Sequence, residues 1–116
     1  MQSFEKIKSN RDFRRLYAKG KSYVTPFFVL YTAKGRKGKL RFGITVGKKI
    51  GGAVQRNRAK RIITAAFRSV APNVINGYDV VAVARTRVLE TKSTAVAELM
   101  KKQFKKVGLW NYEKTD

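Results

Sequence analysis

The segment from residue 53 to residue 70 places apolar side chains at helical spacing on one side and cations on the other. The apolar set is Ala59, Ile62, Ile63, Ala66, Phe67 and Val70. With a turn of about 100° per residue, the opposite face carries a polar set, with Arg56 at its border: Asn57, Lys60, Arg61, Thr64 and Arg68. We predict an amphipathic helix that buries one side in a core and presents guanidinium, ammonium and amide groups to phosphates.

The charge of the whole chain indicates the same kind of partner. Twenty-seven Lys and Arg against seven Asp and Glu give a formal net charge of +20 on 116 residues. Because self-repulsion on this scale destabilises a compact state, we expect a polyanion to neutralise it in use. The apolar residues are periodic, which indicates one folded RNA-binding domain over residues 1–116 rather than a disordered basic tail. Residues 1–8 and 113–116 are expected to be flexible tails.

Absent residue types narrow the chemistry. The chain has no Cys and no His, so it has no zinc finger, thiol nucleophile or imidazole base. Its carboxylates are few and scattered: Glu5, Asp12, Asp79, Glu90, Glu98, Glu113 and Asp116. We therefore predict no catalytic centre in this chain and identify no metal ligand. No apolar run is long enough to span a bilayer, and the N-terminus lacks a secretory signal, so we expect a cytoplasmic protein.

Elsewhere the chain alternates between helical and extended patterns. Ser9 is a candidate N-cap for a first helix that ends near Lys21, and a last helical pattern covers residues 91–107. β-Branched and aromatic residues predict three strands: 27–33, 40–47 and 78–84. The order α-β-β-α-β-α, with a further short strand possible, predicts an α+β fold, a two-layer sandwich of a mixed sheet and helices. By the general rule, the strand–helix–strand connection through the basic helix is expected to be right-handed.

Aromatic residues near the cations raise the hypothesis of a platform on which unpaired bases stack. Phe13 and Tyr17 lie in the first predicted helix, and Tyr31 lies on the strand face opposite to Phe28. By this alternation we expect Phe28 in the core and Tyr31 in an exposed groove. For Phe13, ordinary core packing explains the sequence about as well as stacking does.

Three further features fit such a platform. Leu40 to Gly47 alternates apolar with small or polar residues, so one strand face forms a floor for a flat or extended ligand. Gly51 and Gly52 leave backbone N–H groups accessible before the basic helix, which predicts a phosphate seat. Trp110 and Tyr112 either join the platform or pack against the end of the last helix.

The residues around the basic helix resemble the protein subunit of bacterial ribonuclease P. The signature of that family is an Arg-Asn pair followed by Lys-Arg on a helix, preceded by Lys-Lys-x-Gly and Ala-Val. Here the run is Lys48-Lys49-Ile50-Gly51-Gly52-Ala53-Val54-Gln55-Arg56-Asn57-Arg58-Ala59-Lys60-Arg61. Further landmarks follow in order: Asp12-Phe13 with Tyr17 and Gly20, Phe28-Val29-Leu30-Tyr31, Arg41-Phe42-Gly43, and Tyr78-Asp79-Val80-Val81. One departure is Thr64-Ala65, where the family often has Arg-Glu, and it predicts slightly weaker RNA binding.

The resemblance implies a function as well as a fold. Such proteins bind a catalytic RNA and help it cut the 5′ leader from precursor tRNA, with the chemistry and the Mg²⁺ ions belonging to the RNA. The implied fold is ribosomal protein S5 domain 2-like, with a left-handed β-α-β crossover. Matching positions assign an RNA face to Lys48, Lys49, Arg56, Asn57, Arg58, Lys60, Arg61 and Arg68, and a leader-binding cleft to Phe13, Tyr17, Tyr31 and Trp110. No organic cofactor, membrane or obligate protein partner is expected.

Two other nucleic-acid functions fit the charge and size. A ribosomal or general RNA-packing protein would have the same composition but would not need an ordered aromatic cleft. A nucleic-acid chaperone would bind any strand through charge alone, with an affinity that depends on salt and not on RNA identity. Membrane-surface binding is a weaker alternative, because the apolar helix faces are expected to be used by the core.

Overall fold

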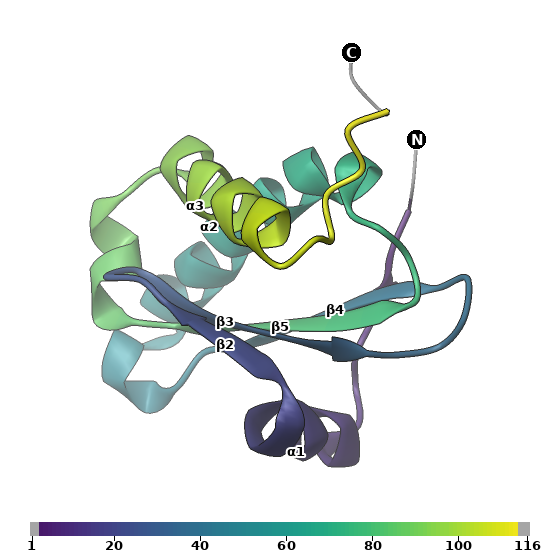
Figure 1. The fold of residues 1–116 in the computed structure, drawn as a ribbon. Helices are drawn as coiled ribbons and strands as arrows, with labels where there is room; N and C mark the ends of the chain where they lie inside the picture. Colours follow the sequence, from purple (N-terminus) through teal and green to yellow (C-terminus); the bar gives the residue numbers. More distant parts are fainter. Residues whose placement is uncertain (1–2, 114–116) are drawn as a thin grey trace.

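The structure is a computed structural model that describes residues 3–113 (Figure 1). In chain order the elements are β1 (Glu5–Lys6), α1 (Asn10–Lys19), β2 (Lys21–Val24), β3 (Phe28–Lys34), β4 (Leu40–Thr45), η1 (Lys48–Ile50), α2 (Ala53–Val70), η2 (Ala71–Asn73), β5 (Tyr78–Ala84), η3 (Thr86–Glu90) and α3 (Ser93–Lys106). The η elements are short 3-10 helices. Of the predicted tails, residues 1, 2 and 114–116 lie outside the described part of the chain.

The strands form one mixed sheet in the order β1-β4-β5-β3-β2. β3 runs antiparallel to both of its neighbours, and Tyr31 on β3 lies opposite Val81 on β5. β4 runs parallel to β5 on one side and to β1 on the other, and Arg41 on β4 lies opposite Asp79 on β5. α1 follows β1 in the chain. Because β1 pairs with β4, α1 lies close to β4 and β5, the strands that precede and follow the basic helix in sequence.

Part of the N-terminal lead-in is ordered by the sheet. Glu5 and Lys6 pair with β4, and the backbone N–H of Ile7 donates to the carbonyl oxygen of Phe42 at 3.0 Å. The Ile7 side chain is buried. For these residues the expected flexible tail is wrong, because a two-residue strand is too short for hydrophobic periodicity to detect.

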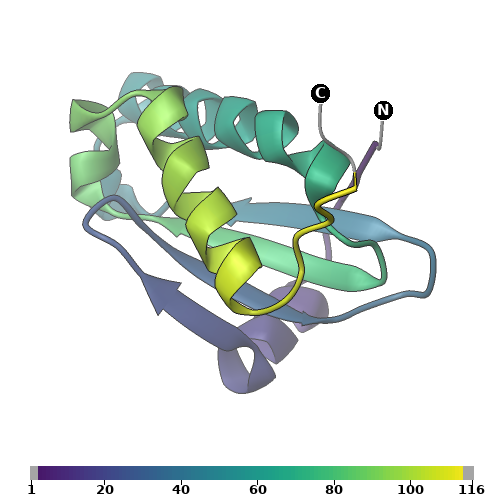
Figure 2. The same cartoon turned by 45° about the horizontal axis from the view of Figure 1, so that its top comes forward.

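Helices cover both faces of the sheet (Figures 1 and 2). α2 and α3 pack side by side over one face, where the main core surrounds Phe42 and Phe67. α1 lies against the opposite face, where Leu16 packs with Ile7 and Val81. The predicted mixed sheet and the order of helices are confirmed, but the two-layer description is incomplete because α1 adds a helix to the second face.

The connection from β4 through α2 to β5 is left-handed. β4 and β5 are parallel neighbours, and Figure 2 shows α2 returning above the sheet between them. With the helix toward the viewer and both strands pointing up, β5 lies to the left of β4. The right-handed expectation from the general rule is wrong here, and the hand is the one that the family resemblance implies.

Local capping explains where the helices begin and end. The Ser9 hydroxyl oxygen accepts a hydrogen bond from the backbone N–H of Arg11 at 3.2 Å, as expected of an N-cap. α2 ends at Val70, before Pro72, as predicted. Gly108 follows α3 with φ of +77°, a conformation that ends a helix and favours glycine. No helix within residues 3–113 has both the length and the apolar character needed to cross a membrane.

Candidate nucleic-acid interface

The cationic face of α2 is open to solvent. Its predicted residues are exposed except Arg56, which is half-buried: Asn57, Arg58, Lys60, Arg61 and Arg68. Lys48 and Lys49, on η1 just before α2, are exposed as well. No acidic residue occurs from residue 48 to residue 70, and within residues 3–113 no carboxylate forms an ion pair with these cations. The face therefore carries uncompensated positive charge, which suits phosphate groups.

The start of α2 adds backbone donors beside this charge. Gly52 is the N-cap in an extended conformation, and no side chain caps the helix. The first-turn N–H groups thus lie at the positive end of the helix dipole without a side-chain acceptor. Gly51 has φ of +139°, a backbone conformation that favours glycine. The predicted phosphate seat has the required geometry, and phosphate binding there stays a prediction.

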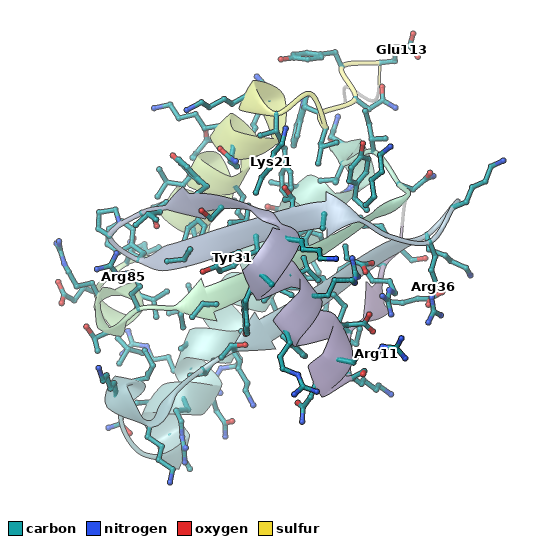
Figure 3. The ribbon with its side chains drawn as sticks, turned by 60° about the horizontal axis from the view of Figure 1, so that its bottom comes forward. Arg11, Lys21, Tyr31, Arg36, Arg85 and Glu113 are labelled. Carbon is teal, nitrogen blue, oxygen red and sulfur yellow. The ribbon has the colours of Figure 1, made fainter. Side chains whose placement is uncertain are left out.

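Three aromatic rings are connected on the sheet face that carries α1. The ring centroids of Phe13 and Tyr17, both on α1, are 6.4 Å apart. Tyr17 meets Tyr31 of β3 in an edge arrangement at 5.3 Å, and its hydroxyl hydrogen-bonds the hydroxyl of Thr45 on β4. Figure 3 shows Tyr31 on the sheet beside α1. Tyr17 is 39% exposed, whereas Phe13 and Tyr31 are half-buried, so Tyr17 presents most ring surface to a ligand.

A groove joins this aromatic cluster to the cationic face of α2. It has a volume of about 560 Å³ and is lined by Asn10, Phe13, Arg14, Tyr17, Ile44, Thr45, Val46 and Lys60. A second hollow, of about 330 Å³, shares Ile44 and Lys60 with the groove and extends to Thr64 and Arg68 of α2. The two hollows together follow the outer edge of β4, where the short β1 pairs only with Arg41 and Phe42. Lys60 therefore belongs both to the cationic face and to the groove.

Gly43 sets the depth at which Phe13 packs on the sheet. A Cβ atom added at Gly43 would lie 2.7 Å from Cζ of Phe13 and 3.1 Å from Cβ of Ile7. Only glycine allows this close approach. The strand face predicted as an open floor is thus covered at Gly43 by α1 and by the lead-in. Thr45, further along the same face, still borders the groove.

Trp110 does not join the aromatic cluster. It forms an isolated bridge with Val74 and packs against the main core, on the face covered by α2 and α3. Lys101 and Lys105 of α3 lie over its ring, at 5.4 and 6.0 Å from the centroid. The structure thus brings together Phe13, Tyr17 and Tyr31 of the predicted cleft but leaves Trp110 elsewhere, because hydrogen bonds of the C-terminal segment fix it beside η2.

An ionic network that the sequence analysis missed holds α1 on the sheet. Arg41 donates to Asp79 from Nε at 2.9 Å and from Nη2 at 2.6 Å, and from Nη1 to Asp12 at 3.3 Å. Arg15 of α1 also donates to Asp79, which is fully buried. Hydrogen bonding to Asp79 raises the pKa of Arg41, and the hydrogen bond from Arg41 lowers the pKa of Asp12. The network fixes the helix that carries Phe13 and Tyr17.

Carboxylates within the described part of the chain do not gather into a metal site. No group of three or more acidic residues there is placed to hold an ion. Asp12 and Asp79, which come together around Arg41, are already neutralised by arginines. The interface offers donors for anions, namely ammonium, guanidinium, amide and backbone N–H groups.

Comparisons with known proteins point to one family. The family model described as Ribonuclease P matches residues 1–108. A ribonuclease P protein component from Clostridium botulinum is 37% identical over 107 residues, which cover 91% of this chain and 96% of that protein. The solved RNase P protein of Staphylococcus aureus superposes with a TM-score of 0.76 at 30% identity, covering 94% of this chain and 100% of that one. The RNase P protein of Thermotoga maritima superposes with a TM-score of 0.75 at 29% identity, covering 88% of this chain and 96% of that one. The chain therefore belongs to the ribonuclease P protein family.

Proposed function

We propose that this chain is the protein subunit of ribonuclease P, and that it helps a catalytic RNA remove the 5′ leader from precursor tRNA. One observation carries the proposal: the groove lined by Phe13 and Tyr17 meets the cationic face of α2 at Lys60. Unpaired bases of a leader can stack on aromatic rings while neighbouring cations contact its phosphates. Binding of the leader in this groove is the central element of the proposal.

The cationic face of α2 is proposed to contact the catalytic RNA. Its arginines can form bidentate hydrogen bonds with phosphates, and Asn57 can pair with phosphate, ribose or a base edge. Because Lys60 borders both surfaces, a leader that leaves the groove at this residue passes directly onto the face that binds the catalytic RNA. This arrangement would hold the two RNAs next to each other.

Cleavage itself is assigned to the RNA. Mg²⁺ bound by the RNA would supply Lewis-acid chemistry at the phosphate that is cut. The side chains of this protein bind and orient the leader, and their positive charge offsets repulsion between the two RNAs. We therefore expect the chain to lower the Mg²⁺ concentration that cleavage requires. The cytoplasm remains the expected place of action, and no obligate protein partner is predicted.

A general RNA-packing function is the alternative. It would account for the charge of α2, but it gives no reason for an aromatic groove held open beside that charge. A chaperone that binds through charge alone would likewise have no use for Tyr17 at 39% exposure next to Lys60. The groove is thus the feature that favours leader binding over both alternatives.

The test is the affinity of the assembled ribonucleoprotein for two ligands, precursor tRNA with a short unpaired leader and mature tRNA. A bacterial ribonuclease P RNA is used with and without this chain, at equal salt and Mg²⁺. We expect the chain to raise affinity for the precursor and to leave that for mature tRNA nearly unchanged. An equal gain for both ligands would refute leader binding and favour non-specific RNA packing.

A further inference from the structure

A second group of aromatic and cationic side chains lies at the end of α3, away from the groove. Lys105 stands 6.0 Å from the ring centroid of Trp110 and 5.3 Å from that of Tyr112, and Lys101 stands 5.4 Å from that of Trp110. We call these four residues, Lys101, Lys105, Trp110 and Tyr112, the C-terminal patch. They combine ring faces with ammonium groups, the chemistry by which proteins hold unpaired nucleotides.

The segment that carries the two rings is held in a defined position. The backbone N–H of Ile75 donates to the carbonyl of Leu109 at 2.9 Å, and that of Asn111 donates to the carbonyl of Asn73 at 2.6 Å. The side-chain amide of Asn73 donates to the carbonyl of Asn111 at 3.0 Å. Because residues 109–111 are anchored on both sides of Trp110, a ligand would meet a preorganised surface and would not need to order it.

Core packing explains Trp110 but not Tyr112. The Trp110 ring is half-buried and packs against the main core. Tyr112 packs against neither core cluster and is 61% exposed, the most exposed aromatic ring among residues 3–113. The described contact of its ring is with the ammonium group of Lys105. Removal of this ring should therefore leave folding intact, which makes Tyr112 a usable probe of binding.

The charge around the patch is strongly positive. Four lysines lie within the last turns of α3: Lys101, Lys102, Lys105 and Lys106. Within residues 98–113, which the structure describes, the acidic residues are Glu98, which lines a hollow of about 260 Å³ together with Lys101, Lys102 and Lys105, and Glu113, which is exposed. Cations thus outnumber acids beside the rings, and a polyanion with exposed bases is the ligand that matches both features.

The patch and the aromatic rings of the leader groove lie on opposite faces of the sheet. α3 covers one face and α1 covers the other, as Figure 1 shows. Figure 3, which views the side of α1, places Glu113 at the far edge of the molecule from Arg11 at the start of α1. A short leader in the groove would have to pass around the sheet to reach Tyr112, so a different RNA segment is the expected occupant.

We propose that the C-terminal patch is a second RNA-binding site, which takes an unpaired segment of the catalytic RNA by stacking a base on Tyr112 and placing phosphates beside Lys105 and Lys101. This inference rests on the proposed function, because it assigns the occupant to the RNA partner of that complex. It adds a contact on the face opposite to the aromatic rings of the leader groove. One protein would then touch its catalytic RNA both through α2 and through the end of α3.

Trp110 provides a direct readout, since it is the only tryptophan in the chain and belongs to the patch. The full-length protein is titrated with a bacterial ribonuclease P RNA while Trp110 fluorescence is followed, with free tryptophan as the control for absorption by the RNA. A short unstructured oligonucleotide with a leader sequence is titrated in parallel. We expect the catalytic RNA to change Trp110 emission at lower concentration than the oligonucleotide does.

Variants identify the site. Tyr112→Ala should raise the midpoint of the titration with catalytic RNA by about 5-fold or more, the range for loss of one base stack, whereas Tyr112→Phe should keep it. Lys105→Gln should also raise the midpoint. Lys37→Gln, in the loop between β3 and β4, is the matched control because it removes one exposed charge outside the patch. The midpoint of this control should stay within about 2-fold of that of the unaltered chain.

Three results would overturn the inference. The first is a Trp110 emission that stays constant although filter retention shows that the RNA is saturated. The second is an equal titration midpoint for Tyr112→Ala and Tyr112→Phe. The third is a Trp110 response to the leader oligonucleotide that is stronger than the response to the catalytic RNA. Failure of the proposed function is a separate result, because it is judged by leader discrimination of the unaltered chain and not by Trp110.

Discussion

Arg41 on β4 and Asp79 on β5 face each other across the parallel strand pair and join through two hydrogen bonds, of 2.9 and 2.6 Å. Asp79 is fully buried, and Arg41 is 7% exposed. Arg15 of α1 donates to the same carboxylate, so the pair also holds α1 against the sheet. The geometry of the leader groove thus depends on an ion pair beneath it that makes no contact with the groove.

Asp79→Asn should destabilise the fold, because it removes the buried negative charge that pairs with Arg41 and Arg15 and leaves Arg41 with Asp12 alone. We expect a loss of about 3–5 kcal/mol in the free energy of unfolding, measured by urea denaturation. Glu90→Gln breaks an exposed pair with Arg87 and serves as control, with an expected change below about 1 kcal/mol. Similar losses for the two variants would contradict a structural role for the Arg41–Asp79 pair.

Acidification should destabilise the protein in part through Asp12. The hydrogen bond from Arg41 lowers the pKa of Asp12 below its ordinary value of 3.8, so the unfolded chain binds the proton more readily than the folded one. Its contribution to stability is complete above that ordinary value and is lost as the pH falls below it toward the folded pKa. Urea denaturation at a series of pH values measures this effect. The free energy of unfolding of Asp12→Asn should depend on pH less steeply than that of the unaltered chain. The same steepness in both proteins would rule out this linkage.

Arg56→Ala and Lys60→Ala should weaken binding to the catalytic RNA through lost phosphate contacts. The plot of log affinity against log salt should become less steep by about 0.7–0.9 for each contact removed. Filter binding over a range of salt concentrations measures this slope, with Lys37→Ala as the charge-matched control outside α2. If both slopes equal that of the control, neither Arg56 nor Lys60 contacts phosphates of the catalytic RNA.

Tyr17→Ala should reduce affinity for precursor tRNA by about 1–3 kcal/mol, the contribution of one base stacked on an aromatic ring. Mature tRNA, which has no leader, should bind as before. Phe13→Ala and Tyr31→Ala should also reduce affinity for precursor tRNA. Because these two rings are half-buried, the free energy of unfolding of both variants must be measured as well. Tyr17→Phe keeps the ring and loses only the hydrogen bond to Thr45, and it should bind nearly normally. Equal losses for precursor and mature tRNA would point to a folding defect instead.

Gly43→Ala should damage the groove from below. The new methyl group would meet Cζ of Phe13 at 2.7 Å, so the Phe13 ring has to move from its place in the groove. We expect weaker precursor binding together with nearly unchanged affinity for the catalytic RNA, since neither Gly43 nor Phe13 belongs to the cationic face of α2. Separate binding assays measure the affinity of the variant for precursor tRNA and for the catalytic RNA. Lower affinity for the catalytic RNA alone would contradict the assignment of the two surfaces.

Local patterns in the sequence predict most of this fold. The Ser9 cap, the apolar stripe of α2 and the near-continuous apolar run of β5 all appear where they were expected. The strand parity that separates Phe28 from Tyr31 is confirmed, with Phe28 in the main core and Tyr31 on the face of α1. The expected exposed position of Tyr31 in a groove is wrong, because Tyr31 is half-buried against the second core and does not line the groove. β1 and β2 were not located. β1 has two residues and pairs with β4, which is distant in sequence, and β2 is a short, mostly exposed edge strand without an apolar repeat.

Long-range contacts explain what the sequence analysis missed at the site. Arg41 was expected on an open strand face, but Asp79, distant in sequence, pairs with it and α1 covers it. Trp110 was expected in the cleft, but the bonds between Asn111 and Asn73 place it on the opposite face. Neither pairing leaves a periodic signal in the sequence. The cationic face of α2 needed no such partner, and it was found from helical spacing alone.

Reconstituted cleavage shows whether this chain acts together with a catalytic RNA on precursor tRNA. A bacterial ribonuclease P RNA and a precursor tRNA are incubated at low Mg²⁺, with and without this chain, and the 5′ end of the product is mapped. We expect removal of the leader at the mature 5′ end only when RNA and protein are both present. Binding of the chain to the RNA without any stimulation of this cut, across compatible catalytic RNAs, would contradict it.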